Sequence, residues 1–227
     1  MAAASPLRRQ RLRAFARHVL MTDALLQAES IKQLQARAQV LRAALLRDGL
    51  ADGHVVAAFA LVREVSGRTL GKRHFPVQLM GGRAILDGVI AEMATGEGKT
   101  LTALLPAVTM ALAGVPVHVV TVNEYLAARD AEEMLSLYSF FGLTVGKVLP
   151  EQQPPERRTA YCSDVTYCVN KELTFDYLRD RTEMLRGTLG ARAAVATLLA
   201  GRAAPRAVMR GLWFAIVDEA DSVLIDE

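Results

Sequence analysis

Two short segments, far apart in the chain, constrain its fold more than any other feature. The first is Met93-Ala94-Thr95-Gly96-Glu97-Gly98-Lys99-Thr100, and the second is Ile216-Val217-Asp218-Glu219-Ala220-Asp221. In the first segment two glycines, a lysine and a threonine stand where a loop would turn into a helix. Backbone N–H groups and the helix dipole can bind a phosphate chain there. The second segment reads as a short apolar strand that ends in acids, so the pair indicates a nucleoside triphosphatase.

Each polar residue in these segments suits a definite task. Lys99 would reach the β- and γ-phosphates, and the Thr100 hydroxyl would ligate Mg²⁺. The acids after the strand suit a metal-organising aspartate and a water-activating glutamate. A strict phosphate-loop pattern has glycine at the position of Met93, and the form found here is the one used by helicase-like motors. The alternative is a glycine-rich turn that caps a helix and binds nothing, and the acid-ended strand disfavours it.

Composition excludes several other classes of protein. The 227 residues suit one or two domains, and although 52% are hydrophobic, no apolar run approaches the roughly 20 residues of a membrane span. The basic start lacks the apolar core of a secretory signal. The cysteines, Cys162 and Cys168, lack metal-ligand spacing and are expected to be free thiols. The net charge of +3 does not by itself argue for nucleic acid.

Hydrophobic patterning predicts an α/β fold. Residues 1–50 look helical, and a second helix closes at Gly71. Strands and helices alternate after that, which predicts a parallel sheet with helices on both faces, preceded by N-terminal helices. Ligands of such sheets bind at the carboxyl ends of the strands, where both segments lie. We expect strands at 90–93, 117–122, 144–148 and 213–217, a strand within 161–169, helices at 99–112, 123–140 and 171–178, and a loop at 150–155.

Longer motifs add a specific resemblance. In order, they are Arg73-His74-Phe75-Pro76-Val77-Gln78-Leu79 with Gly81-Gly82, Val119 to Glu132, Thr166 to Glu172, Phe175 to Asp180, and Asp218 to Glu227. Five long motifs in this order make chance agreement negligible. The chain resembles the SecA family, the ATPase motors of bacterial preprotein export, closely over residues 55–227 and in general character before that.

The resemblance implies a motor with two RecA-type ATPase domains. Residues 1–54 would form an N-terminal helical arm, and residues 55–227 would form part of the first RecA-like nucleotide-binding domain. Because the chain ends inside a motif that continues in the family, the sheet is expected to be incomplete, as in a fragment or a truncated reading frame. The implied activity is that of a protein-secreting ATPase in the complete motor, with the 227-residue chain inactive alone.

Carried over residue by residue, the resemblance assigns a nucleotide site for ATP and Mg²⁺. Gln78 matches the glutamine that reads the adenine edge, and Asp218 matches the residue that, with Thr100, holds Mg²⁺. Glu219 matches the residue that orients the attacking water, and His74 is expected to be structural. The residues that match the phosphate-binding segment are Gly96, Glu97, Gly98, Lys99 and Thr100.

The resemblance also implies partners and a location. They are a SecYEG-type translocation channel, preprotein clients and no nucleic acid, at the cytoplasmic face of the bacterial inner membrane. The arginines within residues 8–17 form either a solvated helix face or a patch for anionic lipid. Two alternatives stay open: a superfamily-2 DEAD-type RNA helicase, favoured by the literal Asp-Glu-Ala-Asp at 218–221, and a non-catalytic nucleotide-binding fragment.

Several positions depart from the family pattern. Pro76 stands where the family usually has an acid, Glu124 where aspartate is common, and Ala128 where a polar or basic residue is usual. The alanine- and arginine-rich stretch 189–210 is longer than the usual connector. These departures favour a divergent paralogue over the housekeeping motor.

Overall fold

The computed structural model describes residues 5–187 and 207–224. Three helices come first: α1 (Pro6–Leu26), α2 (Ile31–Asp48) and α3 (Asp52–Thr69). The expected helical region 1–50 is thus two helices, because Ser30 caps α2: its hydroxyl accepts from the Gln33 N–H, and the Gln33 side chain accepts from the Ser30 N–H. The predicted boundary at residues 54 and 55 falls inside the first turn of α3 and stays a prediction.

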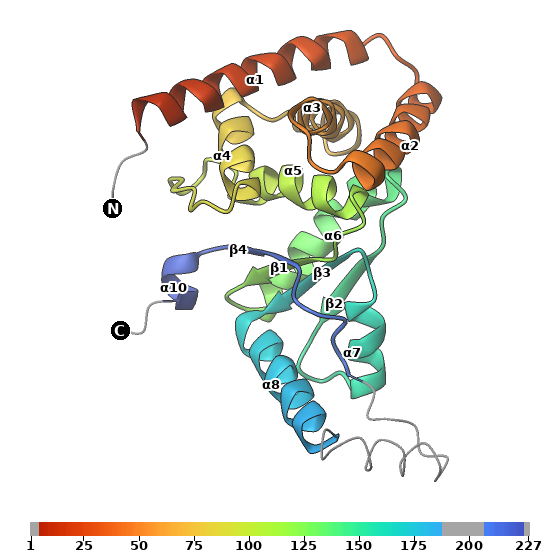
Figure 1. The fold of residues 1–227 in the computed structure, drawn as a ribbon, viewed down its shortest axis with the longest axis vertical. Coiled ribbons are helices and arrows are strands. Elements are labelled where there is room, and N and C mark those ends of the chain that lie inside the picture. Colours follow the sequence, from red (N-terminus) through yellow and green to blue (C-terminus); the bar gives the residue numbers. More distant parts are fainter. Residues whose placement is uncertain (1–4, 188–206, 225–227) are drawn as a thin grey trace.

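Helices and strands alternate through the rest of the chain, as Figure 1 shows. The sheet is wholly parallel, with strand order β2-β3-β1-β4, and the register pairs Val119 with both Tyr167 and Ile216. This confirms the predicted α/β class. The remaining elements are α4 (Pro76–Leu86), α5 (Lys99–Leu112), β1 (Val117–Thr121), α6 (Glu124–Phe140), β2 (Val145–Val148), α7 (Pro154–Tyr161), β3 (Val165–Val169), α8 (Asn170–Gly187), β4 (Phe214–Val217) and α10 (Ala220–Leu224).

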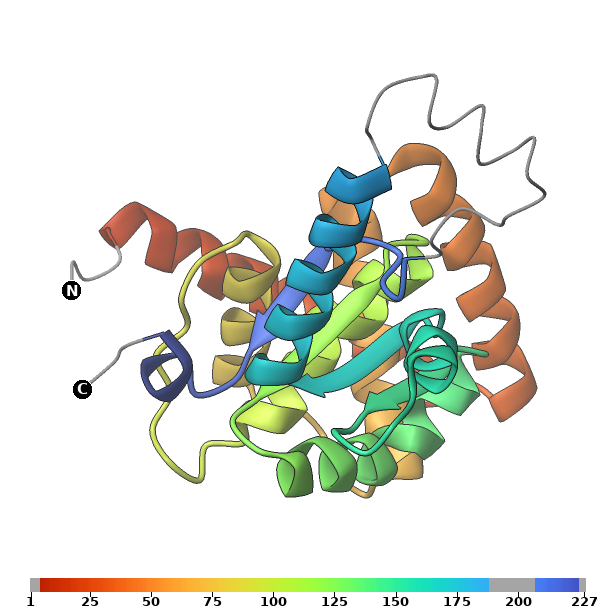
Figure 2. The same cartoon turned by 90° about the horizontal axis from the view of Figure 1, so that it is seen from below.

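Helices cover both faces of the sheet. Val119 and Tyr167 face α5 and α6, within a core that continues into the N-terminal helices. Val120 and Cys168 point the other way, into a smaller core shared with Tyr161 of α7. Side chains alternate between the two faces along each strand, so strands β1 and β3 are buried at every position. Figure 2 shows α8 crossing the second face.

The expected strand at 90–93 is wrong. These residues form an irregular segment, and Ile90 is 72% exposed. A strand needs a neighbour to pair with its backbone groups, and none of the four described strands pairs with this segment.

Three helices also differ from the sequence-based expectation. α7 begins at Pro154, inside the expected loop, because Pro154 can occupy the first helical turn at no hydrogen-bond cost. α8 runs on to Gly187, well past the expected end at residue 178. α4 was not expected as an element, and Pro76 again occupies its first position. The departure at Pro76 is therefore compatible with the local backbone.

None of the helices in the described ranges is long and apolar enough to cross a membrane. Most of the alanine- and arginine-rich stretch 189–210 lies outside those ranges.

Candidate nucleotide site

The phosphate loop, defined here as residues 94–98, is a tight turn that leads directly into α5. The Glu97 N–H donates to the Ala94 carbonyl (3.2 Å), and the Ala94 N–H donates to the Glu97 carboxylate (2.9 Å). Gly96 and Gly98 have φ values of +85° and +80°, a left-handed conformation that other residues rarely adopt. The two glycines therefore meet a backbone requirement of the turn.

The loop is followed by a helix end suited to an anion. Lys99 and Thr100 are the first two residues of α5. The first-turn N–H groups of a helix have no acceptor within the helix, and the helix dipole adds positive potential at that point. A Cβ placed on Gly96 would meet no atom within 4 Å, so there is open space beside the loop. Backbone shape, charge and space all fit a phosphate chain.

Gln78 lies against this loop. Its amide donates to the Glu97 carbonyl (2.7 Å) and accepts from the Phe75 N–H (2.8 Å) at the start of α4. A Cβ on Gly98 would overlap the Gln78 amide nitrogen, so glycine permits this close approach. Gln78 is only 4% exposed. Its predicted contact with an adenine edge would have to use the second amide N–H or displace one of these bonds, and that role stays a prediction.

The acidic segment follows β4. The Asp218 N–H donates to the Val120 carbonyl of β1 (2.9 Å), and the Asp218 carboxylate accepts from the Glu219 N–H (3.0 Å). Glu219 has φ +54°, which is unusual for a residue with a side chain and marks a sharp change of chain direction before α10. Asp218 is half-buried and Glu219 is exposed.

The fold brings the two segments to the same edge of the sheet. α5 packs against both β1 and β4, and it leads into the start of β1, so it runs antiparallel to the strands. Its first residues, Lys99 and Thr100, therefore lie at the carboxyl ends of the strands, the same edge at which Asp218 emerges. In Figures 1 and 2 the segment before α5 and helix α10 lie on the same side of the molecule.

Mg²⁺ could be held there only with the help of a nucleotide. Within the described ranges, no group of three His, Cys, Asp or Glu side chains comes together as a metal site. Mg²⁺ is typically bound by one or two protein ligands together with phosphate oxygens and waters. Thr100 and Asp218 fit that donor set, with the phosphates supplied by the bound nucleotide.

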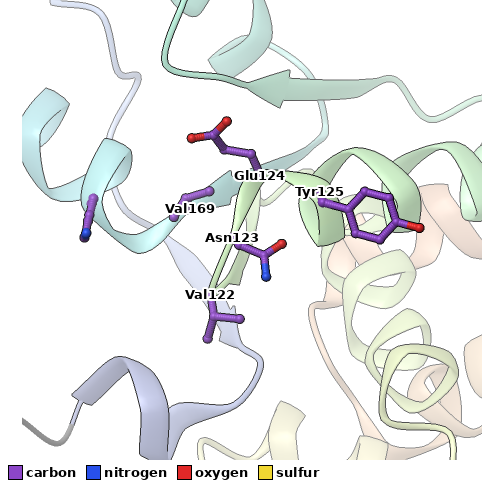
Figure 3. Close-up of a pocket in the computed structure, with 6 residues that line it drawn as sticks. Val122, Asn123, Glu124, Tyr125 and Val169 are labelled. Carbon is purple, nitrogen blue, oxygen red and sulfur yellow. The ribbon is translucent and has the colours of Figure 1, made fainter. Parts of the chain in front are cut away.

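A pocket of about 420 Å³ lies next to this edge, at the carboxyl ends of β1 and β3 (Figure 3). The Asn123 side chain accepts from the Leu126 N–H (2.9 Å) and so caps α6. The lining residues are Val122, Asn123, Glu124, Tyr125, Val169 and Lys171. The phosphate-loop residues do not line it, so this pocket is separate from the loop.

Sequence reasoning missed Asp130 of α6. Its side chain is buried and pairs with Arg129 (2.7 Å). Burial raises the pKa of Asp130, the bond to Arg129 opposes that shift, and the charge of Asp218 adds to it. The charge of the acidic segment therefore reaches the side chain of Asp130. Its only signal in the sequence was membership of the motif from Val119 to Glu132.

His74 is fully buried, in keeping with its expected structural role. Its Nε2 lies 2.8 Å from the Leu101 carbonyl in the first turn of α5. Burial is the main cause that lowers the pKa of His74 to about 4. The imidazole is therefore neutral near pH 7, and Nε2 carries the proton because a carbonyl can only accept.

Comparison with known proteins shows the family of the chain. The model of the SecA DEAD-like domain matches residues 2–227. Protein translocase subunit SecA 2 of Nitrosospira multiformis is 59% identical over 99% of this chain and 34% of its own length. SecA 1 of Thermobifida fusca is 52% identical (80% of this chain, 17% of its own), and SecA of Granulibacter bethesdensis is 48% identical (95% and 22%).

The chain thus spans about a third or less of the length of these relatives. The match nevertheless covers both the phosphate loop and the acidic segment, which the fold has placed at one edge of a parallel sheet. The chain belongs to the SecA family, within its DEAD-like domain.

Proposed function

We propose that this chain is the ATP-binding part of a SecA-like motor that couples ATP hydrolysis to protein export. The observation that carries the proposal is the phosphate loop, with its two left-handed glycines, at the same sheet edge as the acidic segment after β4. The relatives are named protein translocase subunits, which favours export over other uses of ATP. The partners would be a SecYEG-type channel and preprotein clients.

Each site residue has a proposed task. Lys99 and the N–H groups of Gly96, Glu97 and Gly98 would bind the β- and γ-phosphates, while Gln78 would read adenine. Thr100 and Asp218 would hold Mg²⁺, which offsets charge on the phosphates when it is bound. Glu219 would orient the attacking water.

ATP titration with Mg²⁺, in the presence and absence of RNA, tests the proposal. We expect saturable binding of ATP that RNA leaves unchanged. RNA-dependent binding would favour the DEAD-type helicase instead, and no binding at all would reject the nucleotide site. In motors of this type ATP lies between two RecA-like domains, and an arginine from the second domain typically contributes roughly 10³–10⁵ in rate. We therefore expect negligible turnover by residues 1–227 alone.

Two substitutions distinguish the proposed roles of Asp218 and Glu219. Asp218→Asn should weaken Mg²⁺-dependent ATP binding, because Asp218 would hold the metal. Glu219→Gln should retain ATP and, in a completed motor, stop hydrolysis, because the amide cannot activate water. Equal losses of binding in both variants would contradict this division.

The N-terminal arginines support a proposed place at the cytoplasmic face of the inner membrane. Arg8, Arg9, Arg11, Arg13 and Arg17 are all exposed on α1, and Leu7 is 74% exposed beside them. Basic side chains next to an apolar one suit the surface of an anionic bilayer. Sedimentation with vesicles that contain anionic lipid, with neutral vesicles as the control, measures this contact.

A further inference from the structure

Residues 72–78, here called the connector, comprise part of the segment between α3 and α4 together with the first three residues of α4. The connector touches both the N-terminal helices and the phosphate loop. At its start the Ser66 hydroxyl of α3 donates to the Lys72 carbonyl (2.6 Å). At its end the Gln78 amide donates to the Glu97 carbonyl (2.7 Å). A movement of the connector would therefore reach the loop directly.

An ionic cluster holds the connector against α1 and α3. It contains two acids, each with a side chain only 1% exposed: Asp23 of α1 and Glu64 of α3. Arg73 of the connector pairs with Glu64 and, through Nη1, with Asp23 (3.2 Å). The cluster comprises Asp23, Arg63, Glu64, Arg68 and Arg73.

Direct hydrogen bonds lead from this cluster to α5. Arg63 pairs with Asp23, and its Nε donates to the His74 carbonyl (2.8 Å). The His74 ring in turn donates to the carbonyl of Leu101, two residues after Lys99 (2.8 Å). His74 is 0% exposed, so water cannot replace this bond while the core stays closed. Asp23 is thus linked to the phosphate-binding end of α5 by three successive contacts.

A second buried cluster provides an internal comparison. Arg157 of α7 pairs with Asp176 of α8 (3.0 Å) and with Glu172 (2.5 Å), and the Asp176 side chain is 0% exposed. Asp176 resembles Asp23 in burial and in its pairing with arginine. None of its members contacts the connector or the phosphate loop through the bonds found in the described ranges. It supports the fold without reaching the site.

We propose that the ionic cluster positions the phosphate loop, with Asp23, Arg63 and His74 as positioning residues. The inference rests on the proposed ATP site. A small misplacement of groups that bind a ligand can cost a large factor in function, so an anchored α5 keeps the loop N–H groups directed at one point. The link also works in reverse: ATP at the loop should stabilise the contact of α1 with the connector, because coupling between two sites is reciprocal.

Hydrogen exchange in the 227-residue chain tests this directly, without nucleotide. In Asp23→Asn, we expect exchange of the backbone amides at 102–105, which donate within α5, to rise at least tenfold over wild type, on the order of known site-to-site couplings. The matched control is Asp176→Asn, which removes an equally buried arginine-paired charge from the second cluster. It should leave these amides within about threefold of wild type. Comparable changes in both variants would overturn the proposal.

Arg63→Lys is the second variant, in case Asp23→Asn folds poorly. Lysine keeps a positive charge near Asp23 but cannot present the guanidinium geometry that joins Asp23 to the His74 carbonyl. We expect faster exchange of the amides at 102–105 here too, and wild-type exchange would contradict the proposed path.

The ATP dissociation constant is the final readout. It should rise about tenfold in Asp23→Asn and stay near wild type in Asp176→Asn. If wild type binds no ATP, the proposed function fails, and the exchange experiment still decides the positioning role. If wild type binds ATP and Asp23→Asn binds it equally well, the positioning role fails alone.

Discussion

The ionic cluster and the phosphate-loop edge lie on two sides of the connector, and they use charge differently. In the cluster, Asp23 and Glu64 are almost wholly buried and their charges are neutralised by arginines of the same chain. At the loop edge, Lys99 forms no ion pair within the described part of the chain, and Glu219 is exposed. Loss of a charge should therefore destabilise the fold in the cluster and weaken ligand binding at the loop edge.

The largest effect should come from Arg63→Met. It leaves the buried Asp23 carboxylate with one of its two arginines, and breaking a buried ion pair typically costs about 3–5 kcal/mol. Urea denaturation measures the change in the free energy of unfolding. The control is Arg47→Met, whose partner Asp48 is on the surface, and it should cost less than about 1 kcal/mol. Equal losses of unfolding free energy in the two variants would contradict the difference that we draw between buried and exposed ion pairs.

The next effect is a pH dependence due to His74, which lies between the two regions. Its pKa is about 4 in the folded protein, below the ordinary value of 6.5, so the unfolded state binds its proton first as pH falls. The stability from neutral His74 is complete above pH 6.5 and is lost toward pH 4, by roughly 3 kcal/mol.

His74→Gln isolates this contribution. Glutamine can still donate to the Leu101 carbonyl, yet it does not titrate. Urea denaturation from pH 7 to pH 4 should therefore show a shallower loss of stability in the variant. The pKa of His118 is also lowered by burial, but His118 is present in both proteins and cancels in the difference. Parallel pH profiles would show that His74 is not protonated on unfolding as we expect.

Lys99→Ala should give a smaller effect, confined to binding. It deletes the fixed positive charge at the start of α5, so the ATP dissociation constant should rise at least tenfold, or about 1.4 kcal/mol. The free energy of unfolding should change by less than about 0.5 kcal/mol, as for other surface substitutions. Isothermal titration and urea denaturation measure the two quantities. Lys32→Ala, at an exposed position of α2, is the control and should alter neither.

The smallest effect concerns the pocket beside the loop. Asn123→Ala removes the cap of α6 and should cost about 1 kcal/mol of stability, which Asn123→Ser should largely restore. Neither variant should change ATP affinity, because the pocket and the phosphate loop share no lining residue. A loss of ATP affinity in both variants would indicate that the nucleotide site includes the pocket.

Local patterns were sufficient to predict much of the fold. Two runs rich in β-branched residues form buried strands, at 117–121 and 165–169, and Asn123 caps the helix that follows the first of them. The prediction of a strand at 90–93 was wrong because its apolar residues satisfy a strand pattern while no described strand pairs with the segment. Whether such a segment becomes a strand depends on a partner that is remote in sequence, which a local pattern does not report.

Sequence alone determined the chemistry that this chain can offer. Gly96, Gly98, Lys99 and Thr100 must act together because they are neighbours in the chain, and the acids after β4 read as a second half of the site. The alternation of strands and helices also predicted that both halves lie at the carboxyl ends of strands, whereas only the tertiary structure joined Asp23 to His74 through Arg63. The physical reason is burial. A sequence identifies the charged residues, but packing decides which of them are removed from water and therefore need a partner of opposite charge.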